Sequence, residues 1–300
     1  MVDTGTGRAV AVEALARFPA GYERRPDQWF ADAVAVGESG ALELAAAQGA
    51  VRGLADLPAH LDLTVNVSPD VAMSPDFRRW LMQVPLGRLV LELTEHAQVP
   101  DYDALLRALA PARKRGLRIA VDDAGAGYAS MRHMLMLRPD LIKLDISLVR
   151  DVDTDRSRRA LCAAVVEFAH QTGAQIVAEG VETLDELRTL QLLGADYVQG
   201  YLLQRPTAVA DLVLQDYPAL AEREGDTGVT GLTELVGEMS MAGHSTATIA
   251  ARLNQLGWRR RDGVRWSRAS VTRQLLQGAE SDVAQVLPGP TVGIVSPVAG

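Results

Sequence analysis

The chain has 300 residues with a net charge of −8, and its 48% apolar content is enough for a sizeable core. No apolar run is long enough to cross a membrane and the first residues do not resemble a signal peptide, so we expect a cytoplasmic protein without a membrane segment. The single Cys162 excludes a disulfide framework and a thiolate metal site, so any metal would have to bind oxygen atoms.

Apolar runs typical of strands alternate with helical patterns up to residue 203. Strands are predicted at residues 8–12, 61–67, 88–91, 117–121, 141–149, 175–178 and 197–203, and helices at residues 27–36, 42–54, 101–115, 151–171 and 183–193. This alternation predicts parallel pairing, and no Gly-rich phosphate loop follows the first strand. An α/β fold of the TIM-like (β/α) barrel type is therefore favoured over an open sheet. Residues 1–7 look like the tail of a strand and a hairpin turn, so we expect the barrel to lack its first strand.

Oxygen-bearing side chains recur where the predicted strands end. Asp122 and Asp123 follow one strand directly, and four other strands end in the same way, at Glu13, Asn66, Glu92 and Glu179. The ends of barrel strands meet on one face, so we expect these side chains to converge. Adjacent carboxylates repel one another without a cation, which favours a metal site over an ordinary Asp-Asp turn. Oxygen ligands alone select Mg²⁺ or Mn²⁺ rather than zinc.

Lys143 is one of only two lysines in the chain and lies in a predicted strand. An aliphatic residue would pack better in that place, so we expect the lysine to orient water or stabilise charge beside the acids. The alternative is a buried ion pair with a carboxylate. The number of neighbouring acids favours the catalytic interpretation.

Seven blocks of the sequence, in order, resemble the signatures of the EAL domain family, whose members are cyclic di-GMP phosphodiesterases. The match runs from the first residue to about Pro206. The blocks are Glu13-Ala14-Leu15, Asn66-Val67-Ser68-Pro69, Glu92-Leu93-Thr94-Glu95, residues 122–128, Lys143-Leu144-Asp145, residues 178–183 and Gln199-Gly200-Tyr201.

The resemblance implies hydrolysis of cyclic di-GMP to linear pGpG, with Mg²⁺ or Mn²⁺ as a pair of ions, by a barrel that forms a homodimer. It assigns catalytic roles to Lys143, Glu179 and Asp123, and metal binding to Glu13, Asn66, Glu92, Asp122, Asp123 and Glu179. By the same resemblance, Arg17 and Gln199 bind substrate and Glu95 anchors the loop after the acid pair. The alternative is a non-catalytic cyclic di-GMP receptor that regulates a DNA- or protein-binding C-terminal domain, but the complete ligand set favours the enzyme.

Two features differ from the family pattern. Ala124 stands where the family has Phe, so the loop after the acid pair is expected to be more mobile or differently regulated. The family also carries a Gln-Pro pair on its opening strand that contacts a guanine, and the present sequence begins after that point. We therefore expect either a native start further upstream or weaker substrate binding.

The C-terminal part has a different character, because residues 241–279 hold seven Arg against one Asp while the rest of the chain is acidic. We expect a barrel over residues 1–217, a linker over 218–230, a small helical domain over 231–279 and a disordered tail over 280–300. Helices are predicted at residues 232–242, at residues 245–256 after a turn at Gly243, and from a cap at Ser267.

This helical spacing resembles the helix-turn-helix of the recombinase-type DNA-binding domain found in serine recombinases. We expect base contacts from the second helix, at Thr246, Thr248 or Arg252. DNA contacts are predicted for Arg252, Arg259, Arg260, Arg261, Arg265 and Arg268. The alternative is an arginine-rich helical unit that docks on another protein.

Overall fold

The computed structural model describes residues 1–18, 24–93, 99–124, 128–214, 216–217, 236–241, 243–255 and 264–283. It divides into two compact units, Met1–Gly225 and Asp226–Gly300, and the division falls inside the segment expected to be a linker. In the described part of the chain, no helix is long and apolar enough to cross a membrane.

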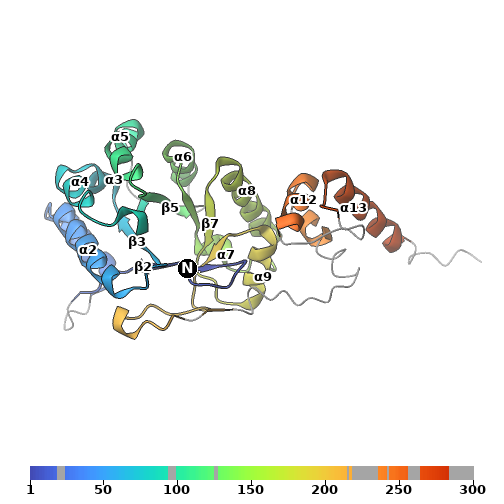
Figure 1. Cartoon of the computed structure of the whole chain (residues 1–300), viewed down its shortest axis with the longest axis horizontal. Helices are drawn as coiled ribbons and strands as arrows, with labels where there is room; N and C mark the ends of the chain where they lie inside the picture. The colour runs from blue at the N-terminus through green and yellow to red at the C-terminus, as the bar shows by residue number, and fades with distance from the viewer. Residues whose placement is uncertain are drawn as a thin grey trace, which may run out of the picture. The chain divides into compact units, whose positions relative to one another are not determined.

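The first unit is built on one eight-stranded sheet with helices outside it (Figure 1). The strands are β1 (Val2–Asp3), β2 (Ala11–Ala14), β3 (Asp62–Val67), β4 (Leu89–Leu93), β5 (Arg118–Ala124), β6 (Leu141–Leu144), β7 (Gln175–Ala178) and β8 (Tyr197–Val198). They lie in the order β1-β8-β7-β6-β5-β4-β3-β2, with β2 to β8 parallel and β1 antiparallel to β8. The result is a nearly closed barrel of mostly parallel strands.

The first strand is short but present, which corrects the expectation of a barrel without it. Val2 and Asp3 pair with β8, and Val2 also bridges Ala9 just before β2, so β1 lies between β8 and the segment that leads into β2. The predicted hairpin turn is confirmed, because Asp3 N donates to Arg8 O at 2.9 Å. Asp3 Oδ1 stabilises the turn by accepting hydrogen bonds from the backbone of Gly5 and Thr6.

The helices of the first unit follow the strands they connect. They are α1 (Pro26–Ala35), α2 (Ser39–Gly53), α3 (Pro69–Met73), α4 (Pro75–Leu81), α5 (Tyr102–Arg113), α6 (Tyr128–Leu137), α7 (Ile146–Val149), α8 (Arg156–Thr172) and α9 (Leu184–Leu193), with 3-10 turns η1 (Leu54–Asp56), η2 (Leu86–Arg88) and η3 (Val209–Asp211). The predicted ends of α8 and α9 are confirmed, since Gly173 and Gly194 adopt the left-handed conformation that terminates a helix.

Two predicted strands are shorter than expected. Residues 146–149 form α7 instead of extending β6, because the Asp145 side chain accepts a hydrogen bond from Ser147 N at 2.9 Å and caps a helical turn. Residues 201–203 form a turn after β8. The short helices α3 and α4 were not predicted, although each begins with a Ser-Pro pair in which Ser caps the helix and Pro occupies its first position.

The barrel interior is layered, because side chains of a strand alternate between inside and outside. Val90, Ala120, Leu141 and Val177 form a buried apolar cluster, against which Met1 and Tyr197 pack. Two residues further along the same strands come Glu92, Asp122, Lys143, Glu179 and Gln199. An apolar layer therefore supports a polar layer at the carboxyl ends of the strands.

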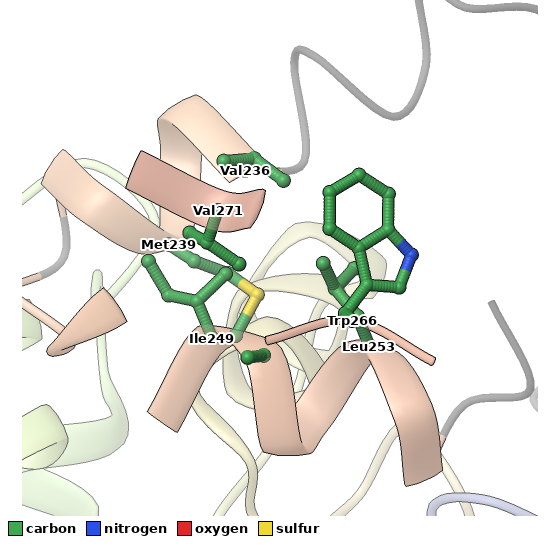
Figure 2. Close-up of a cluster of buried hydrophobic side chains, with 7 residues drawn as sticks. Val236, Met239, Ile249, Leu253, Trp266 and Val271 are labelled. Carbon is green, nitrogen blue, oxygen red and sulfur yellow. The ribbon is translucent and has the colours of Figure 1, made fainter. Parts of the chain in front are cut away.

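The second unit is a small helical bundle with a core of its own. Residues 236–241 are helical, α12 spans Thr246–Gln255 and α13 spans Arg268–Val283, four residues beyond the predicted end of the domain. Figure 2 shows side chains from all three helices, together with Trp266, facing one another. The buried cluster consists of Val236, Met239, Ile249, Ala250, Leu253, Trp266 and Val271.

The turns of this bundle follow the predicted caps. Gly243 has φ +90°, which favours glycine, and its N donates to Ser240 O at 3.0 Å. Ser245 Oγ accepts from Thr248 N at 3.1 Å, and Ser267 Oγ accepts from Ser270 N at 3.3 Å. The resemblance to a recombinase-type helix-turn-helix stays a prediction.

Candidate active site

Lys143 lies at the centre of the polar layer and is almost completely buried, with 1% of its side chain exposed. Its Nζ is 2.8 Å from Glu179 Oε1, 2.9 Å from Glu92 Oε2, 3.1 Å from Asp122 Oδ1 and 3.7 Å from Glu13 Oε2. Four carboxylates from β2, β4, β5 and the end of β7 therefore share one ammonium group. Lys143 therefore forms the buried ion pair that was the alternative to a catalytic role, but with four carboxylates and not one.

Two amide side chains complete this cluster through Glu13. Asn66 Nδ2 donates to Glu13 Oε1 at 3.1 Å, and Gln199 Nε2 donates to Glu13 Oε2 at 2.6 Å. Both carboxylate oxygens of Glu13 are thereby fixed from opposite sides, by β3 and by the residue that follows β8.

The strands position these groups through their register. Asn66 is the direct partner of Glu92 across the β3–β4 pair, so the two side chains lie next to each other on the inner face. The pairing of β5 with β6 is interrupted between Val121 and Ala124, where the acid pair lies. Such irregularities are frequent beside functional sites because they redirect side chains.

Two glycines allow the turns that follow β7 and β8. Gly180 has φ +66°, and a side chain there would clash with Ile146. A side chain at Gly200 would clash with the backbone of Val181, so the turn after Gln199 can approach the turn after Glu179 only with glycine in that place.

The electrostatics of the cluster are dominated by burial. Burial raises the pKa of Glu92 to about 7 and of Glu179 to about 8, while the nearby Lys143 ammonium opposes both shifts. For Lys143, burial lowers the pKa, but Glu92, Glu179, Glu13 and Asp122 together outweigh it and hold the pKa well above its usual value. The cluster thus favours a charged lysine and carries more carboxylates than one lysine can neutralise.

The chemistry of these side chains fits a divalent cation. Glu92 Oε1 and Gln199 Oε1 are buried and have no hydrogen-bond partner within the described part of the structure. No three described His, Cys, Asp or Glu side chains already lie close enough together to hold a metal ion. The carboxylates instead surround Lys143 Nζ, so a cation would have to draw them away from the lysine.

The remaining predicted residues have different positions. Arg17 lies just after β2 with an exposed side chain, and its Nη1 donates to Ala16 O at 3.0 Å. Asp123 belongs to β5, but its side chain is outside the described part of the structure, as are the whole of Glu95 and of Arg259, Arg260 and Arg261. The sequence did not indicate Glu43 of α2, whose Oε2 accepts from Ser68 N at 2.7 Å and holds the loop after β3.

Comparison with known proteins decides the family. A model of the EAL domain matches residues 1–206. The chain belongs to the EAL domain family. Cyclic di-GMP phosphodiesterase PA2567 of Pseudomonas aeruginosa is 34% identical to it over 223 residues, which cover 68% of this chain and 37% of that protein. Cyclic di-GMP phosphodiesterase PdeL of Escherichia coli is 31% identical over 156 residues, covering 50% of this chain and 43% of that protein. The chain therefore spans less than half the length of these two EAL relatives.

Solved EAL structures have the same fold. The PaMucR phosphodiesterase in complex with c-di-GMP matches with a TM-score of 0.62 at 28% identity, covering 71% of this chain and 91% of that chain. The manganese and cyclic di-GMP complex of Klebsiella pneumoniae BlrP1 matches with a TM-score of 0.61 at 32% identity, covering 67% of this chain and 53% of that chain. The described barrel is therefore an EAL barrel.

Proposed function

We propose that the protein hydrolyses cyclic di-GMP to linear pGpG with the help of divalent cations, Mg²⁺ or Mn²⁺, bound as a pair. The observation that carries this proposal is the convergence of Glu13, Glu92, Asp122 and Glu179 on Lys143 at one end of the barrel. Related EAL proteins named as cyclic di-GMP phosphodiesterases, and the BlrP1 complex with manganese, support it.

The proposed reaction adds water to one phosphorus and breaks its bond to a ribose 3′ oxygen, which takes up a proton and leaves as a hydroxyl. Bound cations would supply an activated water and charge stabilisation. The groups that would hold them are Glu13, Asn66, Glu92, Asp122, Asp123 and Glu179. Lys143 holds its positive charge among these carboxylates and can orient the attacking water, while Gln199 and Arg17 bind the substrate.

Incubation of the full chain with cyclic di-GMP and Mn²⁺ is expected to yield pGpG, and chelation is expected to stop the reaction because the carboxylates alone cannot activate water. Chromatography of the products checks this result. Binding of cyclic di-GMP without turnover would favour the non-catalytic receptor instead, and absence of both binding and turnover would contradict the proposal.

Three finer expectations stay predictions. The homodimer would use an apolar surface, and α6 offers Met131, Leu135 and Met136, which are 61%, 63% and 44% exposed. The cytoplasmic location is the second of these predictions. Control of the reaction by the loop after Ala124 concerns residues outside the described structure.

A second candidate function, DNA binding by the second unit, is supported by the exposed face of α13. Arg268, Ala269, Thr272 and Arg273 are exposed, and their spacing places them on one side of the helix. Arginine and threonine provide the charge and hydrogen bonds that duplex DNA accepts. Asn254 fixes the start of α13, because its side chain pairs with both N and O of Trp266 at 2.7 Å.

This face is a better candidate for base contacts than α12, where we expected them from the sequence. Thr246, Thr248 and Arg252 are only half exposed, and the Thr248 hydroxyl is 2.8 Å from Ser245 Oγ in the helix cap. The exposed residues of α12 include Ala247 and Ala251, which offer no hydrogen bonds. We therefore propose that α13, with Arg265 beside it, contacts DNA.

Two matched alanines test this surface in the full chain. Ala269→Glu is expected to weaken binding to a fluorescent random-sequence duplex by about tenfold or more, because it places a carboxylate against phosphates. Ala251→Glu adds the same charge on α12 and is expected to change binding little. Arg273→Ala should flatten the slope of log affinity against log salt by about 0.9. If Ala251→Glu weakens DNA binding more than Ala269→Glu does, the contact belongs to α12. If the parent chain shows no salt-dependent DNA binding at all, the alternative of docking on another protein is favoured.

A further inference from the structure

A segment that follows the last barrel strand lies against the barrel, and its described hydrogen bonds to the barrel come from one residue, Tyr217. We call residues 206–214 and 216–217 the strap; it includes η3 (Val209–Asp211). Tyr217 N donates to Gly7 O at 2.7 Å, and Tyr217 Oη donates to Leu203 O at 2.8 Å. Among the described residues from 206 to 217, these two are the hydrogen bonds that join the strap to the barrel.

Apolar packing holds the strap only weakly. Val213 and Leu214 are 64% and 38% exposed. A cavity of about 80 Å³ lies between the strap and the barrel, lined among others by Gln199, Gly200 and Leu212. Since the strap does not fill this space, its position depends mainly on the two hydrogen bonds of Tyr217.

Leu203, the partner of the Tyr217 hydroxyl, ends a turn that is tied to the candidate active site. Leu203 N donates to Gly200 O at 3.1 Å, and Leu202 N donates to Val181 O at 3.0 Å. Val181 N in turn donates to Gln199 O at 3.1 Å. The turn over residues 200–203 is therefore joined to Gln199 and to Val181, two residues after Glu179.

The other partner of Tyr217 is Gly7, which precedes Glu13 in the chain, whereas Leu203 follows Gln199. Gly7 belongs to the hairpin that leads into β2, which carries Glu13. Glu13 accepts the 2.6 Å hydrogen bond from Gln199. Tyr217 thus connects the segment before Glu13 with the turn after Gln199.

We propose that Tyr217 is a positioning residue for the phosphodiesterase reaction and acts through Gln199. By holding Leu203 and Gly7 together, it keeps the Gln199 amide against Glu13 and keeps the turn beside Glu179 in place. This inference rests on the proposed function for its kinetic consequence, but its structural part does not.

Tyr217→Phe removes the hydroxyl and keeps the ring and the backbone N–H. We expect kcat/KM for cyclic di-GMP to fall by about three- to tenfold, the effect of losing one neutral hydrogen bond. Tyr197→Phe is the matched control, because Tyr197 begins β8 and its hydroxyl accepts a hydrogen bond of 2.7 Å from Gln175, the first residue of β7. In the Gln199→Ala background, Tyr217→Phe should have no further effect, since residues that act through each other are not additive. Equal losses in the two Tyr variants, or additive losses with Gln199→Ala, would overturn the proposal.

Hydrogen exchange of the same variants separates this proposal from the proposed function. Tyr217→Phe should accelerate amide exchange at Leu202 and Leu203, whereas Tyr197→Phe should leave these amides unchanged. If the parent chain does not hydrolyse cyclic di-GMP, faster exchange would still support the positioning role of Tyr217, and only the proposed function would fail. Unchanged exchange at Leu202 and Leu203 in Tyr217→Phe would overturn it whatever the activity.

Discussion

Glu179→Gln is expected to lower kcat for cyclic di-GMP by about 10²- to 10³-fold, with the fold retained. Glu179 follows β7 directly, and its Oε1 is 2.8 Å from Lys143 Nζ. Glutamine has nearly the same volume and can still accept a hydrogen bond from the lysine, so the packing should survive. It has no negative charge for a cation, so the charge stabilisation of the reaction should be lost.

The measurement is steady-state turnover in Mn²⁺, with circular dichroism to check the fold. Asp185→Asn is a matched control, since it removes one carboxylate from an exposed ion pair with Arg188 a few residues further along. We expect that control to leave kcat unchanged, because an exposed pair of this kind contributes little. Near-normal turnover by Glu179→Gln would mean that Glu179 is not part of the reaction centre.

Most of the site was predictable because barrel strands impose a simple geometry. A side chain two residues beyond an inward apolar residue also points inward, so an acid near the end of an apolar run must lie at the mouth of the barrel. Glu92 after Val90 and Lys143 after Leu141 follow this rule. The sequence alone showed that a lysine in a buried strand is unusual. It did not show how many carboxylates would surround that lysine.

Contacts between distant segments could not be predicted in the same way. Glu43 and Ser68 belong to a helix and a loop, and no sequence pattern links them. The same holds for Tyr217, whose partners Leu203 and Gly7 are brought together only when the sheet closes. Local capping also overrode strand propensity at residues 146–149, where the apolar run Ile-Ser-Leu-Val became a helical turn after Asp145.

Lys143→Met should have the second large effect, this time on stability. In the presence of a chelator we expect the free energy of unfolding to fall by about 3–5 kcal/mol at pH 8.5, because breaking a buried ion pair leaves uncompensated charge. Glu92 is fully buried and Glu179 is largely so, and both would lose their ammonium partner. The matched control is Lys114→Met, which removes the only other lysine from an exposed position at the end of α5 and should change stability by less than about 0.5 kcal/mol.

The destabilisation should be smaller at pH 6 than at pH 8.5. The pKa values of about 7 for Glu92 and about 8 for Glu179 exceed the ordinary 4.5, so the folded protein binds more protons than the unfolded chain between about pH 4.5 and pH 8. Stability from these groups therefore falls as pH rises through that window. The pKa of Lys143 is raised well above its ordinary value, so the lysine is positively charged at both pH 6 and pH 8.5. Its own titration therefore does not contribute to the difference between the two pH values.

At pH 6 both glutamates lie below their pKa values of about 7 and about 8 and are already mostly protonated, so loss of the lysine leaves little uncompensated charge there. At pH 8.5 both groups are mostly ionised, and without the lysine the carboxylates repel one another. Urea unfolding followed by circular dichroism at both pH values, in chelator, measures the difference. If Lys143→Met and Lys114→Met lower the free energy of unfolding equally at both pH values, the four carboxylates do not depend on Lys143 for charge compensation. The central position of Lys143 would then serve the reaction and not stability.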